Sequence, residues 1–416
     1  MKNYFLQFTL ISFLFVYTPD TKAQKIIGFL GDWHSGYTNY INNTLQYEYL
    51  TDVVLAFAIP NADGSISVGA NFYTQLNLLR TQLHTKGKKL HFSAGGWSAS
   101  NYNNGGRRDP DPVQEMMKSE STREIFVSNV LKIVKDYNLD GFNFDWEYPE
   151  ASDAFAVEEV LISLRIGLND LEDELGKSLE LSIAVSASQT YSVGYSEDAI
   201  SLVDYVYIMA FDNNTEHHSS VSFAKSGMDY WLNTKNLEPE QLILAIPFYS
   251  RNPYGSYRIF SNEDPSAYFN DEDGLLNSYN YNSKPVIEEK INELNLRGGA
   301  GVFIWEIFED RTDEYSLLKV LYSNLVGTDE VKKELEKVEV APNPIAETIT
   351  IDLNSGILSS KEIKYSITDI TGKELLSGVL KGGKNQVVTS NITSKGLYFL
   401  TLKEGANQAT YKLIKK

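Results

Sequence analysis

The chain has 416 residues, of which 42% are hydrophobic and 22% are charged, a composition typical of a globular protein long enough for more than one domain. Its 55 acidic and 37 basic residues give a formal net charge of −18 at pH 7. This charge argues against nucleic acid or an anionic membrane as a partner, because both bind a basic surface. The chain contains no cysteine, so no disulfide can stabilise it.

Residues 1–23 have the organisation of a secretory signal peptide. Lys2 supplies the positive charge, Phe5–Val16 form a short apolar core, and Thr21–Ala23 provide a cleavage site before Gln24. This apolar run is too short to span a membrane comfortably, and no later segment has the unbroken apolar length that a membrane helix requires. We therefore predict export, with no membrane span in the mature chain.

From Lys25 to about Leu325, short apolar segments alternate with segments of helical periodicity, which is clearest in Thr122–Tyr137, Ala154–Leu175, Pro285–Leu296 and Asp313–Leu325. Eight strands that alternate with helices indicate a parallel sheet, and eight strands can close a (β/α)₈ TIM barrel. An open doubly wound sheet is disfavoured, because no Gly-rich phosphate loop follows the first strand. The predicted strands are Ile26–Leu30, Val53–Ile59, Lys89–Ser93, Gly141–Trp146, Leu179–Ser186, Tyr205–Met209, Leu242–Ile246 and Gly301–Trp305.

The pattern changes after the last predicted helix. A short, highly charged segment is followed from Thr348 by alternation of apolar and polar residues with period two, which predicts a small all-β sandwich. We therefore expect an α/β barrel domain over residues 25–326, a linker over residues 327–337 and a β-sandwich domain over residues 338–416.

The segment Asp140–Pro149 carries most of the functional information. Polar side chains occupy alternate positions of an otherwise apolar, aromatic run, so Asn143, Asp145 and Glu147 should share one face of the fourth strand. Buried carboxylates are costly unless they are paired or used, and the chemistry of such barrels lies at the C-terminal ends of the strands. Glu147 is therefore predicted to be an acid catalyst, supported by the other two residues.

The segment Asp140–Glu147 closely resembles the Asp-Gly-x-Asp-x-Asp-x-Glu signature of glycoside hydrolase family 18, the chitinases and their relatives. Further segments resemble motifs of this family in the family's order, and the resemblance covers about residues 25 to 325. It implies a (β/α)₈ barrel that cleaves glycosidic bonds next to N-acetylglucosamine. The other matching segments are Ser93–Gly96, Met209–Asp212, Pro247–Arg251 and Trp305.

The resemblance also implies a mechanism that needs no metal and no cofactor. Glu147 would protonate the glycosidic oxygen, and burial together with the charge of Asp145 would raise its pKa for that role. The 2-acetamido oxygen of the substrate would attack the anomeric carbon, while Asp145 orients the acetamido group and Asn143 holds Asp145. The expected substrate-binding residues are Gly96, Trp97, Tyr148, Met209, Phe211, Asp212, Tyr249 and Trp305.

Two positions depart from the family pattern. Asn143 stands where the family has Asp, and an amide can hydrogen-bond Asp145 but cannot share a proton with it. Phe211 replaces a Tyr whose hydroxyl bonds the acetamido oxygen, a loss of about 1–3 kcal/mol, or roughly 10–100-fold in rate. In addition, Pro247–Gly301 is too short for a full α+β insertion beside the seventh helix, which predicts a shallow, open cleft and endo-acting cleavage.

Residues from about Val338 resemble the C-terminal sorting domain of the type IX secretion system of Bacteroidetes, in Ala341–Pro344, Ile367–Lys373, Gly396–Tyr398 and the basic C-terminus. This resemblance implies recognition by the secretion machinery and a secreted protein, free or attached to the cell surface. A carbohydrate-binding module is the alternative, which the absence of Trp from this region disfavours.

Three functions remain open after this reading. The first is a secreted chitinase acting on chitin or chitooligosaccharides. An endo-β-N-acetylglucosaminidase that cuts N-glycan cores would use the same catalytic residues, so these residues do not separate the two. A chitin-binding lectin on an inactive barrel is the third, disfavoured by the presence of Glu147 and kept open by Phe211.

Overall fold

The computed structural model describes residues 24–100, 108–214, 217–251, 253–270, 275–276, 279–325, 334–353, 358, 362–404 and 407–416. The predicted signal peptide and residues 327–333 of the predicted linker lie outside the described residues.

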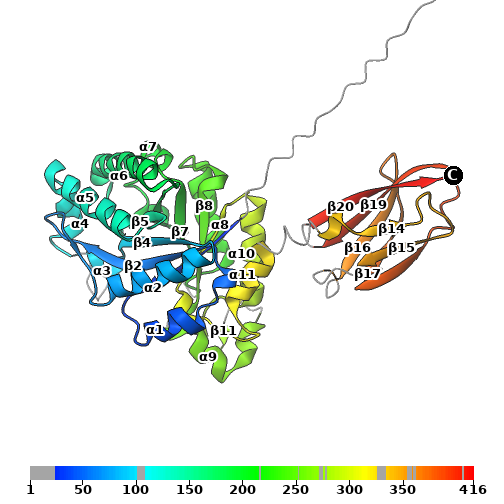
Figure 1. The fold of residues 1–416 in the computed structure, drawn as a ribbon, viewed down its shortest axis with the longest axis horizontal. Coiled ribbons are helices and arrows are strands. Elements are labelled where there is room, and N and C mark those ends of the chain that lie inside the picture. The colour runs from blue at the N-terminus through cyan, green and yellow to red at the C-terminus, as the bar shows by residue number, and fades with distance from the viewer. Residues whose placement is uncertain are drawn as a thin grey trace, which may run out of the picture.

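Eight parallel strands form a closed barrel (Figure 1). The ring runs β1, β2, β4, β5, β6, β7, β8 and β13, and it closes because β1 pairs with both β2 and β13. All eight predicted strands are confirmed. Their bounds are β1 Lys25–Gly31, β2 Asp52–Pro60, β4 Lys89–Gly95, β5 Gly141–Asp145, β6 Glu180–Ser186, β7 Tyr205–Met209, β8 Leu242–Pro247 and β13 Gly301–Trp305.

Helices surround the ring and bury their apolar faces against it (Figure 1). The predicted helix Ala154–Leu175 matches α6, which ends where Gly176 takes a φ of 67°, a backbone conformation that glycine adopts at low cost. The longer helices are α2 Phe72–Thr85, α5 Glu120–Asp136, α6 Ala154–Leu175, α8 Val221–Asn233, α10 Lys284–Leu296 and α11 Leu317–Leu325. The shorter ones are α1 Tyr37–Asn39, α3 Trp97–Ser100, α4 Pro112–Met117, α7 Glu197–Ser201 and α9 Tyr257–Glu263.

The barrel has two apolar layers, because successive residues of a strand face opposite sides. On β1, Ile26 belongs to the layer between strands and helices, whereas Ile27 belongs to the inner layer with Tyr207 and Phe303. On β5, Phe142 and Phe144 are fully buried in the outer layer. The predicted alternation along this strand is therefore confirmed, and it leaves the polar residues of β5 facing the barrel interior.

A small insertion follows β8. It contains helix α9 and two short ribbons, β9–β10 and β11–β12. Helix α10, which follows the insertion, is the seventh helix of the barrel. The segment therefore holds more structure than a helix alone, although every strand in it has two residues. The bounds are β9 Tyr249–Ser250, β10 Gly255–Ser256, β11 Leu275–Leu276 and β12 Tyr279–Asn280; one further short strand, β3 Ile66–Ser67, extends β2.

The C-terminal strands form two antiparallel sheets that share one apolar core. One sheet has the order β14-β15-β18 and the other β17-β16-β19-β20, so the predicted β-sandwich is confirmed. The described residues include no helix that is long and apolar enough to cross a membrane. The bounds are β14 Glu339–Ala341, β15 Thr348–Leu353, β16 Ile363–Asp369, β17 Glu374–Leu380, β18 Gly383–Val388, β19 Gly396–Glu404 and β20 Asn407–Lys415.

Candidate active site

Asp145 is the last residue of β5, at the C-terminal end of the barrel, and two glycines of β4 and its following loop allow a close approach to it. The Gly96 N–H donates to the backbone oxygen of Asp145 at 2.7 Å. A Cβ on Gly95 would lie 1.9 Å from the same oxygen, and Gly95 has a φ of 123° that other residues rarely adopt. The two glycines of the segment Ser93–Gly96 therefore allow β4 to lie close to the C-terminal end of β5.

The carboxyl groups of Asp145 and Glu147 are both buried, and each has a raised pKa. Asp145 is 4% exposed, and burial raises its pKa to about 7. Its Oδ1 atom is buried and has no hydrogen-bond partner among the described residues. Burial and then the charge of Asp145 raise the pKa of Glu147 well above its ordinary value, although hydrogen bonds from Tyr148 and the Trp97 N–H act in the opposite direction. The raised pKa favours the protonated form of Glu147, which is the form that a general acid needs.

Asn143 has different partners from those expected. Its Oδ1 accepts from the Ser93 hydroxyl at 2.8 Å, and its Nδ2 donates to the Ser182 hydroxyl at 3.0 Å. Within the described part of the chain, no hydrogen bond joins Asn143 to Asp145. The predicted hydrogen bond by which Asn143 holds Asp145 is therefore not formed. The neighbouring strands β4 and β6 supply hydroxyls that satisfy the amide, which leaves the carboxyl group of Asp145 without it.

Asp212 follows β7 and is held in a left-handed backbone conformation, with a φ of 58°. Its Oδ1 accepts from the Tyr249 hydroxyl at 2.7 Å and lies 3.0 Å from Nη1 of Arg251. Burial would raise the pKa of Asp212, but hydrogen bonds from His218 and Tyr249 and the charge of Arg251 hold it below its ordinary value. Asp212 is therefore a fixed negative charge, and it contributes to the raised pKa of Glu147.

Three aromatic rings form a platform at the ends of β1, β2 and β13. Trp305 stacks on Phe57 with ring centroids 5.4 Å apart, and Phe57 stacks on Trp33 at 6.3 Å. A Cβ on Gly96 would lie 2.5 Å from the Phe57 ring, which explains the second glycine of its motif. Trp33 is 55% exposed, so the platform offers ring faces to a ligand. Phe57 was missed from the sequence, although an aromatic residue near the end of a barrel strand is a signal that could have found it.

A second aromatic pair lies across the barrel, since β5 and β13 have three strands between them on either side of the ring. Tyr148 stacks on Tyr191 with centroids 5.2 Å apart, and Tyr191 is 53% exposed. Trp97, the first residue of α3, is 45% exposed. The sequence did not indicate Tyr191, because only the fold brings the loop after β6 beside Tyr148. Phe211 and Met209 complete the interior, where Phe211 packs edge-on against Tyr249 and Phe303.

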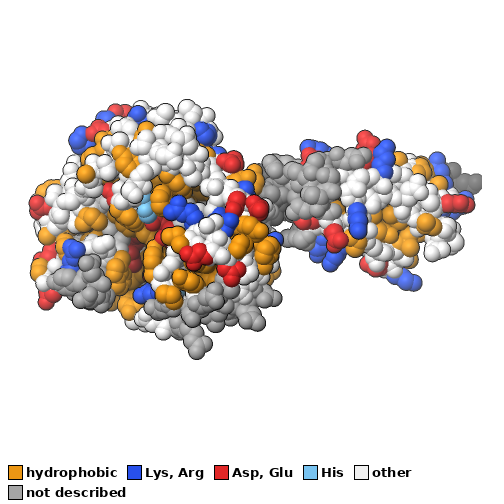
Figure 2. All heavy atoms as spheres, turned by 90° about the horizontal axis from the view of Figure 1, so that it is seen from below, with side chains coloured by type: hydrophobic (Ala, Val, Ile, Leu, Met, Phe, Trp, Pro, Cys, Tyr) orange, Lys and Arg blue, Asp and Glu red, His pale blue; other side chains and the backbone are white. Residues whose placement is uncertain are grey.

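The barrel is hollowed on this side. Figure 2 shows the face on which α1 and α9 lie, and hydrophobic and acidic side chains surround the hollow. Aromatic surfaces with a few polar groups are typical of sites for sugars, which present both apolar faces and hydroxyls. The site therefore combines two buried carboxyl groups with raised pKa values and aromatic rings on opposite sides of the barrel.

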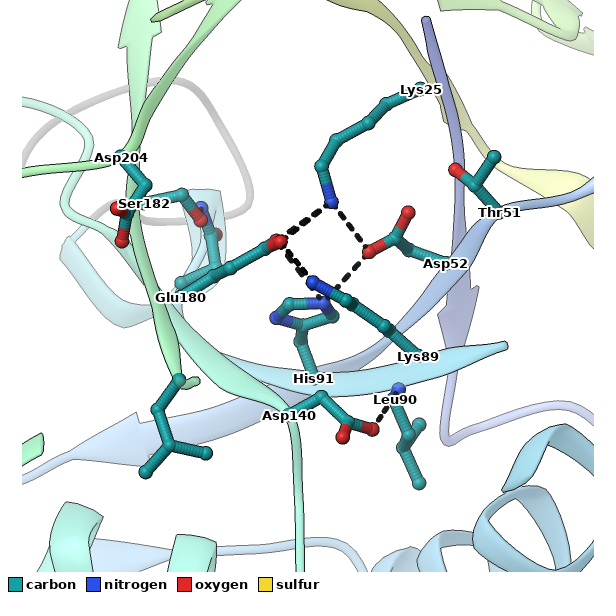
Figure 3. A network of polar contacts seen from close by, with 12 residues as sticks. Lys25, Thr51, Asp52, Lys89, Leu90, His91, Asp140, Glu180, Ser182 and Asp204 are labelled. Carbon is teal, nitrogen blue, oxygen red and sulfur yellow. Dashed lines mark hydrogen bonds and ion pairs between the residues drawn. The ribbon is translucent and has the colours of Figure 1, made fainter. Parts of the chain in front are cut away.

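A different polar cluster lies at the N-terminal ends of the strands (Figure 3). Asp52, His91 and Glu180 offer ligand atoms within 4.8 Å of one another, a spacing that a metal ion could use. The Lys25 ammonium already lies among them, 2.8 Å from Asp52 and 2.7 Å from Glu180, and Lys89 also pairs with Glu180. A metal ion would have to displace this ammonium group, so the cluster fits a structural ion network better than a metal site.

Asp140, which directly precedes β5, likewise has structural contacts. Its Oδ2 accepts from the Leu90 N–H at 2.8 Å (Figure 3). Its carboxylate also pairs with Lys177 and His84. It anchors the start of β5 to the neighbouring strand.

Comparison with known families decides the assignment. The model of glycosyl hydrolases family 18 matches residues 25–310, and all the candidate site residues lie within this range. The chain belongs to glycoside hydrolase family 18. The model of the secretion system C-terminal sorting domain matches residues 339–416, which are the strands of the sandwich.

Relatives of the family 18 domain are distant in sequence. Endochitinase 1 of Metarhizium anisopliae is 25% identical over 333 residues, which cover 66% of this chain and 74% of the relative. The endochitinase of Manduca sexta is 22% identical over 389 residues, covering 74% of this chain and 68% of the relative.

Solved structures of family 18 proteins share the barrel. The chitinase ChiB of Flavobacterium johnsoniae has a TM-score of 0.60 and 24% identity, covering 75% of this chain and 96% of its own. The chitinase-like agglutinin of Robinia pseudoacacia has a TM-score of 0.62 and 19% identity, covering 72% of this chain and 99% of its own. At these identities the likeness establishes the fold alone.

Proposed function

We propose that this family 18 protein is a secreted chitinase that cleaves β-1,4 linkages next to N-acetylglucosamine, in chitin or chitooligosaccharides. The observation that carries the proposal is the pair of buried carboxyl groups, Asp145 and Glu147, with a raised pKa on each, at the catalytic end of the barrel. Burial raises the pKa of both groups, and the charge of Asp145 adds to the rise at Glu147. Carboxyl groups perturbed in this way are found mainly at functional sites, which favours catalysis.

The proposed mechanism follows from these two acids. Glu147 gives its proton to the glycosidic oxygen as the bond to the anomeric carbon breaks. The acetamido oxygen of the same sugar attacks the anomeric carbon and forms an oxazolinium ion, so no carboxylate nucleophile is needed. Asp145, in its ionised form, accepts a hydrogen bond from the acetamido N–H, for which its unpartnered Oδ1 is available. Water then opens the ring, and Glu147 takes back a proton.

The remaining site residues would bind the sugar chain. Trp305 would stack beneath the sugar that carries the reacting acetamido group, with Trp33 and Phe57 extending the platform. Tyr148 and Trp97 would contact the sugars on the leaving side. We propose endo-acting cleavage, because the segment after β8 adds only short ribbons and α9 to the wall of the site.

Phe211 favours a second candidate, a chitin-binding protein of low activity. The phenyl ring packs against Tyr249 and Phe303 and has no hydroxyl with which to bond the acetamido oxygen. We favour the enzyme, because a lectin has no use for the raised pKa of Glu147.

The sorting domain supports export, and we propose that residues 338–416 direct the chain to the secretion machinery. Deleting them should leave the chain inside the producing cell while hydrolysis by the remaining protein is retained. Loss of adsorption to chitin with secretion unchanged would instead support a carbohydrate-binding role for this domain.

The decisive assay incubates the purified protein with chitotetraose and, separately, with a high-mannose glycoprotein, beside a Glu147→Gln variant. A chitinase releases shorter chitooligosaccharides, and the variant does not. Release of the N-glycan alone would assign the protein as an endo-β-N-acetylglucosaminidase. Binding of chitotetraose without turnover in the wild type would assign it as a lectin.

A further inference from the structure

A fully buried polar network lies behind Asp212, and the proposed mechanism does not use it. The loop after β7 carries Phe211 and Asp212 and then turns inward, so that His217, His218 and Ser219 are at most 8% exposed. Buried loops are unusual, because their backbone polar groups must find partners within the protein.

The partners of this loop come from the segment just before α10. The His218 N–H donates to Asn280 Oδ1 at 2.9 Å, and Asn282 Nδ2 donates to the Ser219 backbone oxygen at 2.9 Å. Asn280 is 4% exposed and Asn282 is 1% exposed. Two amide side chains thus fasten the loop after β7 to the adjacent barrel unit.

Lys290 of α10 is the charged member of the network. It is 0% exposed and lies on the face of α10 that packs into the core, between Ile287 and Leu294. Its ammonium group donates to the Ser219 hydroxyl at 2.7 Å and to Asn282 Oδ1 at 2.6 Å. The spacing of the apolar residues on α10 predicts a leucine or isoleucine here, since burying an ammonium group is costly. The lysine must therefore provide something that an apolar side chain would not.

The contacts of Ser219 and His218 lead from Lys290 to the catalytic end. The Ser219 hydroxyl, which accepts from Lys290, donates to the backbone oxygen of Ala210 at 2.6 Å. His218 Nδ1 lies 3.3 Å from the Asp212 backbone nitrogen and 3.4 Å from the Asp212 carboxylate. Asp212 is one of three described non-glycine residues with a positive φ, and such a conformation persists when its surroundings hold it.

We propose that Lys290 is a positioning residue for Asp212, acting through Ser219 and the loop after β7. The lysine and the two asparagines hold the loop so that the Asp212 carboxylate meets both Tyr249 and Arg251. The inference rests on the proposed function, because Asp212 matters to the reaction through its place beside Glu147. Lys290 would therefore affect the rate of the reaction without contacting the substrate.

The test is a double-mutant cycle between Lys290→Met and Asp212→Asn, with chitotetraose as substrate. Methionine has nearly the volume of lysine and removes the donors. We expect Lys290→Met to lower kcat by about 10-fold in the wild-type background and by less than about 2-fold in the Asp212→Asn background, because coupled residues are not additive. Equal losses in both backgrounds would show that Lys290 acts by general stability and would overturn the inference.

Ser219→Ala is the milder variant, in case Lys290→Met does not fold. It removes one hydroxyl and should also lower kcat in the wild-type background only. Lys25→Met is the matched control, a buried lysine of the opposite end whose loss should leave kcat per folded molecule unchanged. Activity lost with Glu147→Gln but unaffected by Lys290→Met and Ser219→Ala would refute the inference and retain the proposed function.

A crystal structure of Lys290→Met tests the inference even if no substrate is turned over. The Asp212 carboxylate should move away from Tyr249 or Arg251, with a change in the φ of Asp212. An unchanged Asp212, with both contacts intact, would show that the lysine does not position it.

Discussion

The two ends of the barrel treat buried carboxyl groups in opposite ways. At the N-terminal end, Asp52 and Glu180 are surrounded by Lys25, Lys89 and His91 (Figure 3). Burial would raise the pKa of Asp52, but the hydrogen bond and charge of His91 and the charge of Lys25 hold it well below its ordinary value.

At the C-terminal end, burial raises the pKa of Asp145 and of Glu147, and the charge of Asp145 adds to the rise at Glu147. Buried carboxyl groups thus have lowered pKa values at one end and raised values at the other. Neighbouring cations favour the ionised form at the N-terminal end, whereas burial favours the protonated form at the C-terminal end, where we propose that the reaction takes place.

The largest expected effect tests whether Glu147 contributes to activity or to stability. Glu147→Gln should lower kcat on chitotetraose by at least about 10²–10⁴-fold, because the amide cannot donate the proton. Its free energy of unfolding at pH 7 should be equal to or higher than that of the wild type, since the amide replaces a costly buried acid. A large fall in stability would mean that Glu147 serves the fold, and the contrast between the ends would fail.

The converse experiment changes the other end. Lys25→Met should lower the free energy of unfolding by about 3–5 kcal/mol, because it leaves two buried carboxylates without their shared cation. Urea unfolding followed by fluorescence measures this loss. The wild-type kcat per folded molecule should be retained, and a matched fall in kcat would show that the two ends are coupled.

Phe211→Tyr sharpens the description of the catalytic end. A hydroxyl at this position could bond the acetamido oxygen, and one such bond contributes about 1–3 kcal/mol, which corresponds to roughly 10–100-fold in kcat. Initial rates on chitotetraose for the wild type and the variant measure the gain. No gain would indicate that the ring, between Tyr249 and Phe303, does not face the acetamido group.

The pH dependence of stability tests the same contrast between the two ends. The pKa of Asp145 is raised from 3.8 to about 7, so its protonated form stabilises the folded state below pH 4, and this contribution is lost as the pH rises through 7. Asp145→Asn should flatten the fall in unfolding free energy between pH 4 and pH 8. Asp52 has the opposite sign, because its lowered pKa stabilises the protein above its ordinary pKa and the contribution is lost in acid. An unchanged profile in Asp145→Asn would assign the pH dependence to other groups.

Much of this organisation was predictable from local patterns. The eight strands, the alternation along β5 and the position of Glu147 follow from hydrophobic periodicity and from motifs that are contiguous in the sequence. The β-sandwich followed from its period-two pattern in the same way. The family assignment rested on the same short segments, and the match over residues 25–310 confirms it.

The partners of the site residues were not predictable, because they come from distant parts of the chain. Ser93 and Ser182 satisfy Asn143 from neighbouring strands, and nothing near residue 143 in the sequence announces this. Tyr191 reaches Tyr148 only because β5 and β6 are adjacent. The apolar spacing of α10 assigns position 290 to the core, but it does not predict the partners of Lys290, Ser219 and Asn282.

The closure of the ring has a consequence for the proposed export of the protein. Lys25, which follows the predicted export signal, begins the strand that pairs with Gly301. The front of the chain therefore cannot finish folding until almost the whole barrel has been synthesised, and contacts of such long range form slowly. A chain that reaches a translocation channel before β13 has been synthesised is therefore still unfolded. The pairing of the first strand with the last keeps the chain in a state that can pass through the channel.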